Sequence, residues 1–271
     1  MEQSRQNGHA EEDKIIEEKL EKIKNIFLVM SGKGGVGKST VAVNLAVSLM
    51  NRGFKTGLMD IDLHGPNTLK MLGMDGRKME VLENQITPLQ YKDNLKVVSI
   101  SSFLDGPETA VIWRGPLKIG VIKQFIGDVT WGDLDYLVID SPPGTGDEPL
   151  TVAQSFKGAK SIIITTPQEV SLLDVSKSVT FCRQVNMPVI GIVENMSGFA
   201  CPHCGKEINI FPKGGAENLA KKSKLPFLGT IPMQPDIAAA SDSGRPFAGN
   251  DGEQPEIGKR FGKIVDTIIQ A

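Results

Sequence analysis

The sequence predicts an α/β fold in which a doubly wound, mostly parallel sheet of about seven or eight strands is flanked by helices. Short apolar runs rich in β-branched residues recur without alternating with polar residues, which is typical of strands buried on both faces. Segments compatible with helices fit between most of these runs, as parallel connections require. The runs are Ile26–Met30, Thr56–Met59, Leu95–Ile100, Tyr136–Ile139, Ser161–Thr165, Val189–Val193 and Phe227–Ile231.

The length and composition favour one globular domain behind a polar extension. The chain has 271 residues and is 40% hydrophobic, which is enough for one large core. We expect residues 1–24 to form a polar N-terminal extension and residues 25–271 to form the domain. Within the extension, residues 11–24 are densely charged and carry isoleucine and leucine at roughly helical spacing. They predict a short charged helix that docks on the body, with partner binding as the alternative.

The charge and the apolar content exclude several classes of protein. A formal net charge of -2 gives no overall electrostatic footprint for nucleic acid. No apolar stretch approaches the roughly 20 residues that span a bilayer, and the first 24 residues are too charged for a signal peptide. We therefore expect a cytoplasmic protein with neither a membrane nor nucleic acid as its partner. Its three cysteines indicate metal or redox chemistry rather than a disulfide framework.

A glycine-rich loop follows the first predicted strand and precedes a helix-compatible stretch from Ser39 to Met50. The loop reads Gly32-Lys33-Gly34-Gly35-Val36-Gly37-Lys38-Ser39 and is followed by Thr40. Glycines let the backbone curl so that successive N–H groups point at phosphate oxygens, beside a helix N-terminus. The pattern in this setting predicts a P-loop NTPase fold that binds ATP, rather than a simple turn. Lys38 would reach the β- and γ-phosphates, and Ser39 would bind Mg²⁺.

Aspartates end two further predicted strands. Asp60 and Asp62 end the second strand, where two carboxylates beside the phosphates suit Mg²⁺ binding through water and orientation of an attacking water. Asp140 follows the apolar residues of the fourth strand, which is the position of a Walker B aspartate near Mg²⁺. The next segment, residues 141–146, is rich in proline and glycine and predicts a loop that senses the γ-phosphate.

Lys33 adds a second lysine to the loop, and the resulting Lys-Gly-Gly-Val-Gly-Lys-Ser-Thr resembles the deviant Walker A motif of the MinD/ParA/nitrogenase-iron-protein class. The resemblance implies that Lys33 reaches the nucleotide of a partner subunit, with the charge-stabilising role of an arginine finger. It also implies that Asp62 positions the attacking water, that Asp60 lies near the metal and that Asn195 binds the base. The alternatives are a solvated lysine at position 33 and a turn-forming asparagine at position 195.

The segment after Asn195 narrows the resemblance. Residues 196–205, which contain Cys201-Pro202-His203-Cys204, closely resemble the Mrp/ApbC-type iron–sulfur cluster carrier ATPases. Together with residues 60–67 and 140–147, they extend the resemblance over most of residues 26–235. A stable [4Fe–4S] or tetrahedral Zn²⁺ site usually needs four ligands, whereas one chain offers two well-spaced thiolates. A symmetric homodimer would supply four, and the resemblance also implies that arrangement.

Other ligands and other chemistry remain open for the cysteine pair. Cys-x-x-Cys alone does not separate an iron–sulfur cluster from structural Zn²⁺, and only the resemblance favours the cluster. Redox chemistry lacks a thioredoxin-like βαβ context. His203 lies between the cysteines, where we expect its side chain to point away from a shared metal. Cys182 falls in a helical stretch, residues 170–186, and is expected to be a buried free thiol.

The resemblance implies an ATPase that binds a [4Fe–4S] cluster at a homodimer interface and transfers it to apo iron–sulfur proteins. One alternative is a MinD/ParA-like positioning ATPase that works on a membrane or on DNA, and another is a zinc-stabilised regulatory ATPase. A MinD-type protein needs a basic amphipathic C-terminal helix. The residues from 255 to 271 carry apolar and basic side chains that suit packing on the body equally well.

Overall fold

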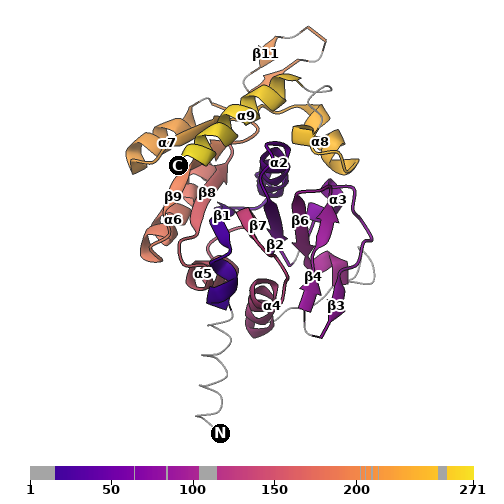
Figure 1. Ribbon diagram of the computed structural model, residues 1–271. Helices are drawn as coiled ribbons and strands as arrows, with labels where there is room; N and C mark the ends of the chain where they lie inside the picture. Colours follow the sequence, from indigo (N-terminus) through magenta and orange to yellow (C-terminus); the bar gives the residue numbers. More distant parts are fainter. Residues whose placement is uncertain are drawn as a thin grey trace.

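The computed structural model describes residues 16–63, 65–83, 85–103, 115–201, 203–204, 206–208, 210–212, 214–249 and 255–271. Its centre is an eight-stranded sheet with the strand order β12-β9-β8-β1-β7-β2-β6-β5 (Figure 1). Neighbouring strands are parallel except β5 and β6, which are antiparallel. The predicted mostly parallel sheet is confirmed. The strands are β1 Ile23–Ser31, β2 Thr56–Asp60, β5 Leu89–Tyr91, β6 Leu95–Ser99, β7 Leu134–Asp140, β8 Lys160–Thr165, β9 Val189–Glu194 and β12 Phe227–Thr230.

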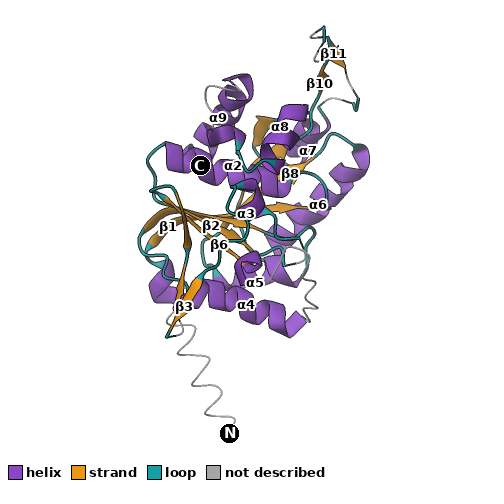
Figure 2. Ribbon diagram, turned by 90° about the vertical axis from the view of Figure 1, so that its right-hand side faces the viewer, coloured by secondary structure: helices purple, strands orange, loops and turns teal. Residues whose placement is uncertain are grey.

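Helices cover both faces of this sheet (Figures 1 and 2). Side chains of β1 alternate between two hydrophobic clusters: Phe27 and Val29 join one, while Leu28 and Met30 join the other. The first cluster includes α2 and α9, and the second includes α4, α5, α6 and α7. A strand buried on both faces needs apolar residues at every position, which is why the runs do not alternate. The helices are α2 Lys38–Asn51, α3 Thr68–Met71, α4 Gly115–Gly127, α5 Asp147–Ser155, α6 Glu169–Gln184, α7 Gly215–Ser223, α8 Pro235–Asp242 and α9 Pro255–Gln270.

The start of the domain differs from the sequence prediction. β1 begins at Ile23, inside the predicted extension, and Ile23 pairs in register with Leu134 of β7. Residues 16–20 are helical, so the predicted helix ends before the strand rather than at residue 24. Ile23 is buried because it belongs to the sheet, although its spacing from Leu20 also fits a helix. The predictions for residues 1–15 lie outside the described residues.

The sequence analysis did not predict the short strands. They include the antiparallel edge strand β5 and two hairpins, β3 Glu80–Leu82 with β4 Gln85–Thr87 and β10 Phe199–Ala200 with β11 Glu207–Ile208. Each contains only two or three residues, which is too short to show a period. The β10–β11 hairpin projects from the body as an outlying arm (Figure 2).

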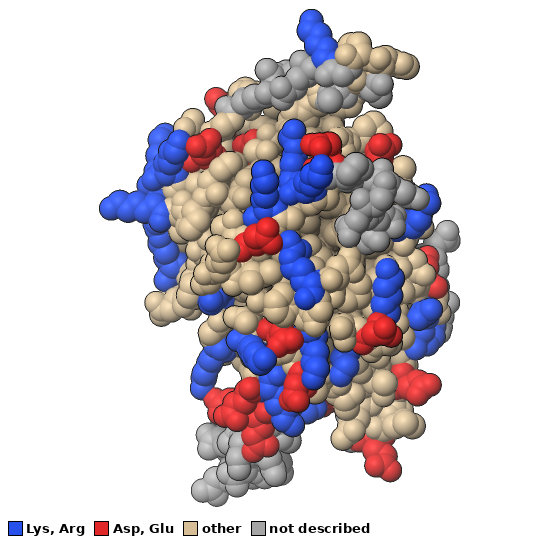
Figure 3. Space-filling view, turned by 45° about the horizontal axis from the view of Figure 1, so that its top comes forward, with Lys and Arg blue, Asp and Glu red and all other residues tan. Residues whose placement is uncertain are grey.

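Charged side chains of both signs are interspersed over the face shown in Figure 3. Lys and Arg side chains cover more of this face than Asp and Glu side chains do, and the two kinds are interspersed. Among the described residues, no helix combines the length and the apolar character that crossing a bilayer requires.

Candidate functional site

The glycine-rich loop connects the end of β1 to the start of α2. Gly35 and Gly37 have positive φ angles of 76° and 82°, which glycine adopts without steric cost. A Cβ atom at Gly37 would lie 2.1 Å from the side-chain nitrogen of Asn195, and one at Gly32 would lie 2.5 Å from the backbone of Asp174. The backbone of Asp174 therefore requires glycine at position 32, and the positive φ favours it at position 37. The loop delivers its backbone to the N-terminus of α2, as the motif predicts.

A pocket of about 380 Å³ opens at this loop. Its walls include Lys33, Lys38, Ser39 and Thr40, together with the loop residues 34–37. Opposite them, other loops and the short helix α3 contribute Asp62, Asn67, Met71, Pro143 and Met196. The pocket lies at the carboxyl end of the central strand, where ligands of parallel sheets bind, and its volume falls within the usual range for small-molecule sites. The predicted phosphate-binding residues thus line one pocket.

Lys38 is paired with the carboxylate of Asp140 beneath this pocket. Lys38 Nζ lies 2.7 Å from Asp140 Oδ1 and 3.9 Å from Asp62 Oδ2. Burial disfavours the charged form of Lys38, but the attraction of Asp140 and the nearby aspartates outweighs it, so the pKa of Lys38 is raised. Asp140 Oδ2 is buried and has no hydrogen-bond partner among the described residues. A buried carboxylate oxygen left open beside a P-loop is suited to a metal-bound water.

Asp60 stands next to Asp140 in the sheet, because the two residues are register partners of β2 and β7. It is fully buried, and it accepts hydrogen bonds from Thr68 Oγ1 at 2.8 Å, from Ser99 Oγ at 3.3 Å and from the Asp62 N–H at 3.0 Å. Burial, followed by the neighbouring Asp140, raises the pKa of Asp60 to about 7. Asp60 therefore ties β6, α3 and the Asp62 backbone together at the edge of the pocket.

Lys33 is half-buried and its side chain reaches the start of α6. Its Nζ donates to Gln168 Oε1 over 3.4 Å, and that oxygen also accepts from Thr166 and Ser171. Gln168 was not predicted as part of the site. Its position just beyond the carboxyl end of β8, which neighbours β1, was the available signal.

The proline- and glycine-rich loop after β7 lies against the P-loop. Pro143 lines the pocket, and the Gly144 N–H donates to the Ser31 carbonyl at 2.8 Å. Gly144 has a φ of 93°, and α5 begins three residues later at Asp147. The loop thus connects the phosphate-binding edge directly to a helix, as a sensor of the γ-phosphate would require.

Asn195 follows β9 and contacts the P-loop from the other side. Its Nδ2 donates to the Val36 carbonyl at 2.9 Å, and the residue is buried. The next residue, Met196, lines the pocket. Asn195 thus lies beside the P-loop, next to a residue that lines the pocket, and its contact with the base stays a prediction.

The two cysteines of the Cys-x-x-Cys motif lie in the β10–β11 hairpin. Cys201 is half-buried, and Cys204 and His203 are exposed. The backbone N–H of Cys204, then that of His203, and the Cys204 thiol donate toward Cys201, which lowers the pKa of its thiol. Within the described residues, no cluster of three or more His, Cys, Asp or Glu side chains could hold a metal ion. Cys182 lies apart, fully buried in α6, as predicted.

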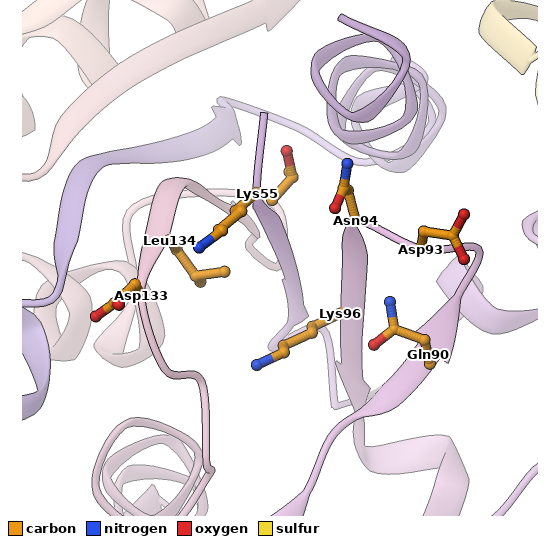
Figure 4. A pocket seen from close by; sticks show the side chains of 8 residues that line it. Lys55, Gln90, Asp93, Asn94, Lys96, Asp133 and Leu134 are labelled. Carbon is orange, nitrogen blue, oxygen red and sulfur yellow. The ribbon is translucent and has the colours of Figure 1, made fainter. Parts of the chain in front are cut away.

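A second pocket, of about 260 Å³, lies near the amino ends of the strands, at the opposite end of the sheet from the P-loop (Figure 4). Most of its residues lie at or just before the starts of β2, β6 and β7, including Lys55, Lys96, Asp93 and Asp133, and Gln90 of β5 also lines it. Lys96 Nζ donates to the Trp131 carbonyl at 2.6 Å, so this lysine serves the packing of the sheet edge. Because the pocket lies at the amino ends of the strands, it is separate from the P-loop site.

The chain is similar in sequence to proteins that handle iron–sulfur clusters. A family model described as the NUBPL iron-transfer P-loop NTPase (ParA) matches residues 22–269. The chain is 49% identical over 262 residues to an iron-sulfur cluster carrier protein of Methanocaldococcus jannaschii, covering 96% of this chain and 89% of that protein. It is 46% identical over 262 residues to the cytosolic Fe-S cluster assembly factor NUBP2 homolog of Nematostella vectensis, covering 95% and 97%. These similarities confirm the resemblance predicted from the sequence.

Two solved structures share the fold of this chain. A nucleotide-binding protein from Archaeoglobus fulgidus, in complex with ADP and with cobalt found, has a TM-score of 0.76 and 42% identity, over 86% of this chain and 91% of that chain. The cell division ATPase MinD of Pyrococcus furiosus has a TM-score of 0.65 and 27% identity, over 91% and 99%. The predicted P-loop NTPase fold is confirmed.

Proposed function

The chain belongs to the family of NUBPL-type iron-transfer P-loop NTPases, and from this premise we propose that it is an ATP-hydrolysing carrier of [4Fe–4S] clusters. In this proposal Cys201 and Cys204 from each of two subunits hold one cluster at a homodimer interface, and the cluster is passed to apo iron–sulfur proteins. The observation that carries the proposal is the pairing of a complete P-loop pocket with two accessible thiols on a projecting hairpin. The names of the relatives support the same cargo.

The nucleotide half of the proposal assigns roles to residues that line or underlie the P-loop pocket. Lys38 and the backbone of residues 32–37 bind the phosphates of ATP, and Ser39 and Thr40 lie at the start of α2 beside them. Ser39 and Asp140 hold Mg²⁺, Asp140 through its open Oδ2, with Asp60 supporting the same edge. Asp62 orients the attacking water, and Asn195 contacts the base. Mg²⁺ supplies charge neutralisation for phosphoryl transfer when it is bound.

We propose that Lys33 of each subunit acts in catalysis on the nucleotide bound to the other subunit. Its ammonium group would stabilise the negative charge that develops on the phosphates during hydrolysis. The hydrogen bond from Lys33 Nζ to Gln168 Oε1 is long, at 3.4 Å, and therefore weak. Lys33 can exchange it for a contact with a phosphate oxygen. Dimer formation and hydrolysis would then depend on one another.

The cysteine half of the proposal follows from the chemistry of thiolates. A cluster binds the deprotonated thiol, and the hydrogen bonds donated toward Cys201 favour that form. Two thiolates fall short of the four that a cluster requires, so a second copy of the chain completes the set. Exposure of Cys204 leaves the cargo accessible to a recipient. The recipients are apo iron–sulfur proteins, and we infer a cytoplasmic location from relatives named as cytosolic factors.

The proposal is tested by anaerobic reconstitution with iron and sulfide, followed by metal analysis, visible absorption and transfer to an apo iron–sulfur acceptor. We expect about four irons per dimer for the wild type. The Cys201→Ala/Cys204→Ala variant should bind ADP normally and hold no cluster, and Cys182→Ala is the matched control that should retain it. A double variant that still holds and transfers a full cluster would reject the proposal. Zn²⁺ bound in place of iron after anaerobic purification would favour the zinc-stabilised alternative.

A further inference from the structure

Glu194 is a buried carboxylate between the nucleotide pocket and the cysteine hairpin. It ends β9 and is 1% exposed. Burying a carboxylate is costly unless its oxygens accept hydrogen bonds. Here Oε1 accepts from the Ser197 hydroxyl at 2.6 Å, and Oε2 accepts from the Ala216 N–H at 3.0 Å. Both oxygens of Glu194 are therefore used, and neither of these donors lies in β9.

The two donors lie at opposite ends of the cysteine segment. Ser197 comes two residues before β10, and Ala216 is the second residue of α7, which follows the hairpin. The N-cap of α7 is Gly214, which has no side chain to cap the helix. Glu194 supplies that cap from another element, where the helix dipole also favours a negative charge. One carboxylate thus closes the base of the segment that carries Cys201 and Cys204.

The residues next to Glu194 reach the nucleotide pocket. Asn195 donates to the Val36 carbonyl of the P-loop at 2.9 Å, and Met196 lines the pocket. The backbone turns sharply here, because Met196 and Gly198 have positive φ angles of 56° and 76°. Four consecutive residues, from Glu194 to Ser197, therefore connect the P-loop to the base of the cysteine segment.

We propose that Glu194 is a positioning residue that transmits the state of the nucleotide pocket to the Cys201–Cys204 segment. A nucleotide that displaces Asn195 or Met196 moves Ser197, and the shared carboxylate links that movement to Ala216 on the far side of the segment. The inference deepens the proposed function and rests on it only for the cargo. It predicts that nucleotide binding changes the surroundings, and therefore the reactivity, of the Cys201 and Cys204 thiols.

The test measures how fast iodoacetamide alkylates each cysteine of the full-length, cluster-free protein, read by peptide mass spectrometry. Rates are compared without nucleotide, with Mg²⁺-ADP and with a non-hydrolysable Mg²⁺-ATP analogue. We expect nucleotide to change the wild-type rate at Cys201 or Cys204 by about fivefold or more, the lower end of typical coupling between sites. Glu194→Gln keeps the size of the side chain but removes its negative charge and leaves one acceptor oxygen where the carboxylate has two. This variant should bind ADP and lose most of the nucleotide effect.

Two further variants keep the test decisive. Ser197→Ala removes only one of the two donors, so it decides the matter if Glu194→Gln does not fold, and it should also lose the nucleotide effect. Ser48→Ala removes a buried hydroxyl that contacts Arg52 at the far end of α2, and it should keep the effect. A nucleotide effect retained in folded Glu194→Gln and Ser197→Ala, or absent from the wild type, would overturn the proposal. A wild type that responds to nucleotide but holds no cluster would contradict the carrier function, and loss of that response in Glu194→Gln and Ser197→Ala would still support the role of Glu194.

Discussion

At the scale of single residues, some residues of the predicted site are neighbours in the sequence, and others are brought together only by the fold. The P-loop residues are adjacent in sequence, so local geometry alone brings Lys33 to Thr40 to one pocket wall. Asp60 and Asp140 were predictable because strand ends of a parallel sheet meet at one edge. Gln168, Thr68 and Glu194 were not predicted, because their roles depend on partners 8 to 135 residues away in sequence.

The two lysines of the loop should have separable effects. Lys38→Ala removes a charged phosphate contact, so we expect nucleotide affinity to fall by about 1.5–3 kcal/mol, which calorimetric titration with ADP measures. It also leaves Asp140 buried without its cation, so the nucleotide-free protein should lose thermal stability. Lys33→Ala should keep nucleotide affinity and lose about 10³-fold or more in ATP turnover. Equal turnover by Lys33→Ala and the wild type would reject a catalytic role for Lys33.

At the scale of elements, burial decides whether a segment was predictable. The seven long strands were predicted because each places apolar side chains into both layers, whereas β5 and the hairpins are too short for a pattern. The C-terminal helix α9 was ambiguous, since its apolar stripe suited either a membrane or the body. In the structure Ile257, Phe261, Ile264 and Ile268 are all buried in the core cluster that includes α2. Packing on the body accounts for the stripe.

Removal of one α9 side chain should destabilise the whole domain. Phe261 is 1% exposed and stacks edge-on against Phe247 at 5.2 Å, so Phe261→Ala should lower the free energy of unfolding by about 3–5 kcal/mol. Urea denaturation measures this loss. Arg260→Ala, on the exposed side of the same helix, should change stability by less than about 0.5 kcal/mol. A negligible loss for Phe261→Ala, accompanied by co-sedimentation with liposomes, would favour the MinD-like alternative.

At the scale of the whole molecule, the buried thiol of Cys182 links stability to pH. Burial raises the pKa of this thiol, which lies 3.3 Å from Ser161 Oγ and 3.5 Å from Met30 Sδ. Its contribution to stability is complete below the thiol pKa of the unfolded chain, about 8.5. It is lost as pH rises from there toward the folded pKa, because the unfolded chain releases the proton first.

Urea denaturation of the wild type and Cys182→Ala between pH 7 and pH 10 tests this linkage. The difference in unfolding free energy should shift against the wild type by about 1.4 kcal/mol per pH unit above the unfolded pKa. Comparison with the variant cancels the titration of Cys201, Cys204 and the tyrosines. A difference that stays constant over the whole range would show that Cys182 ionises equally in both states.

The sequence by itself determined the layered fold, the P-loop and the cysteine pair, because each is written in adjacent residues or in a local period. Only the tertiary structure decided which side chains meet across elements: Lys38 with Asp140, Lys33 with Gln168, and Glu194 with both ends of the cysteine segment. It also assigned the start of β1 to Ile23 and the apolar face of α9 to the core. Such contacts join distant parts of the chain, and their partners are fixed by packing and strand register, which no local pattern specifies.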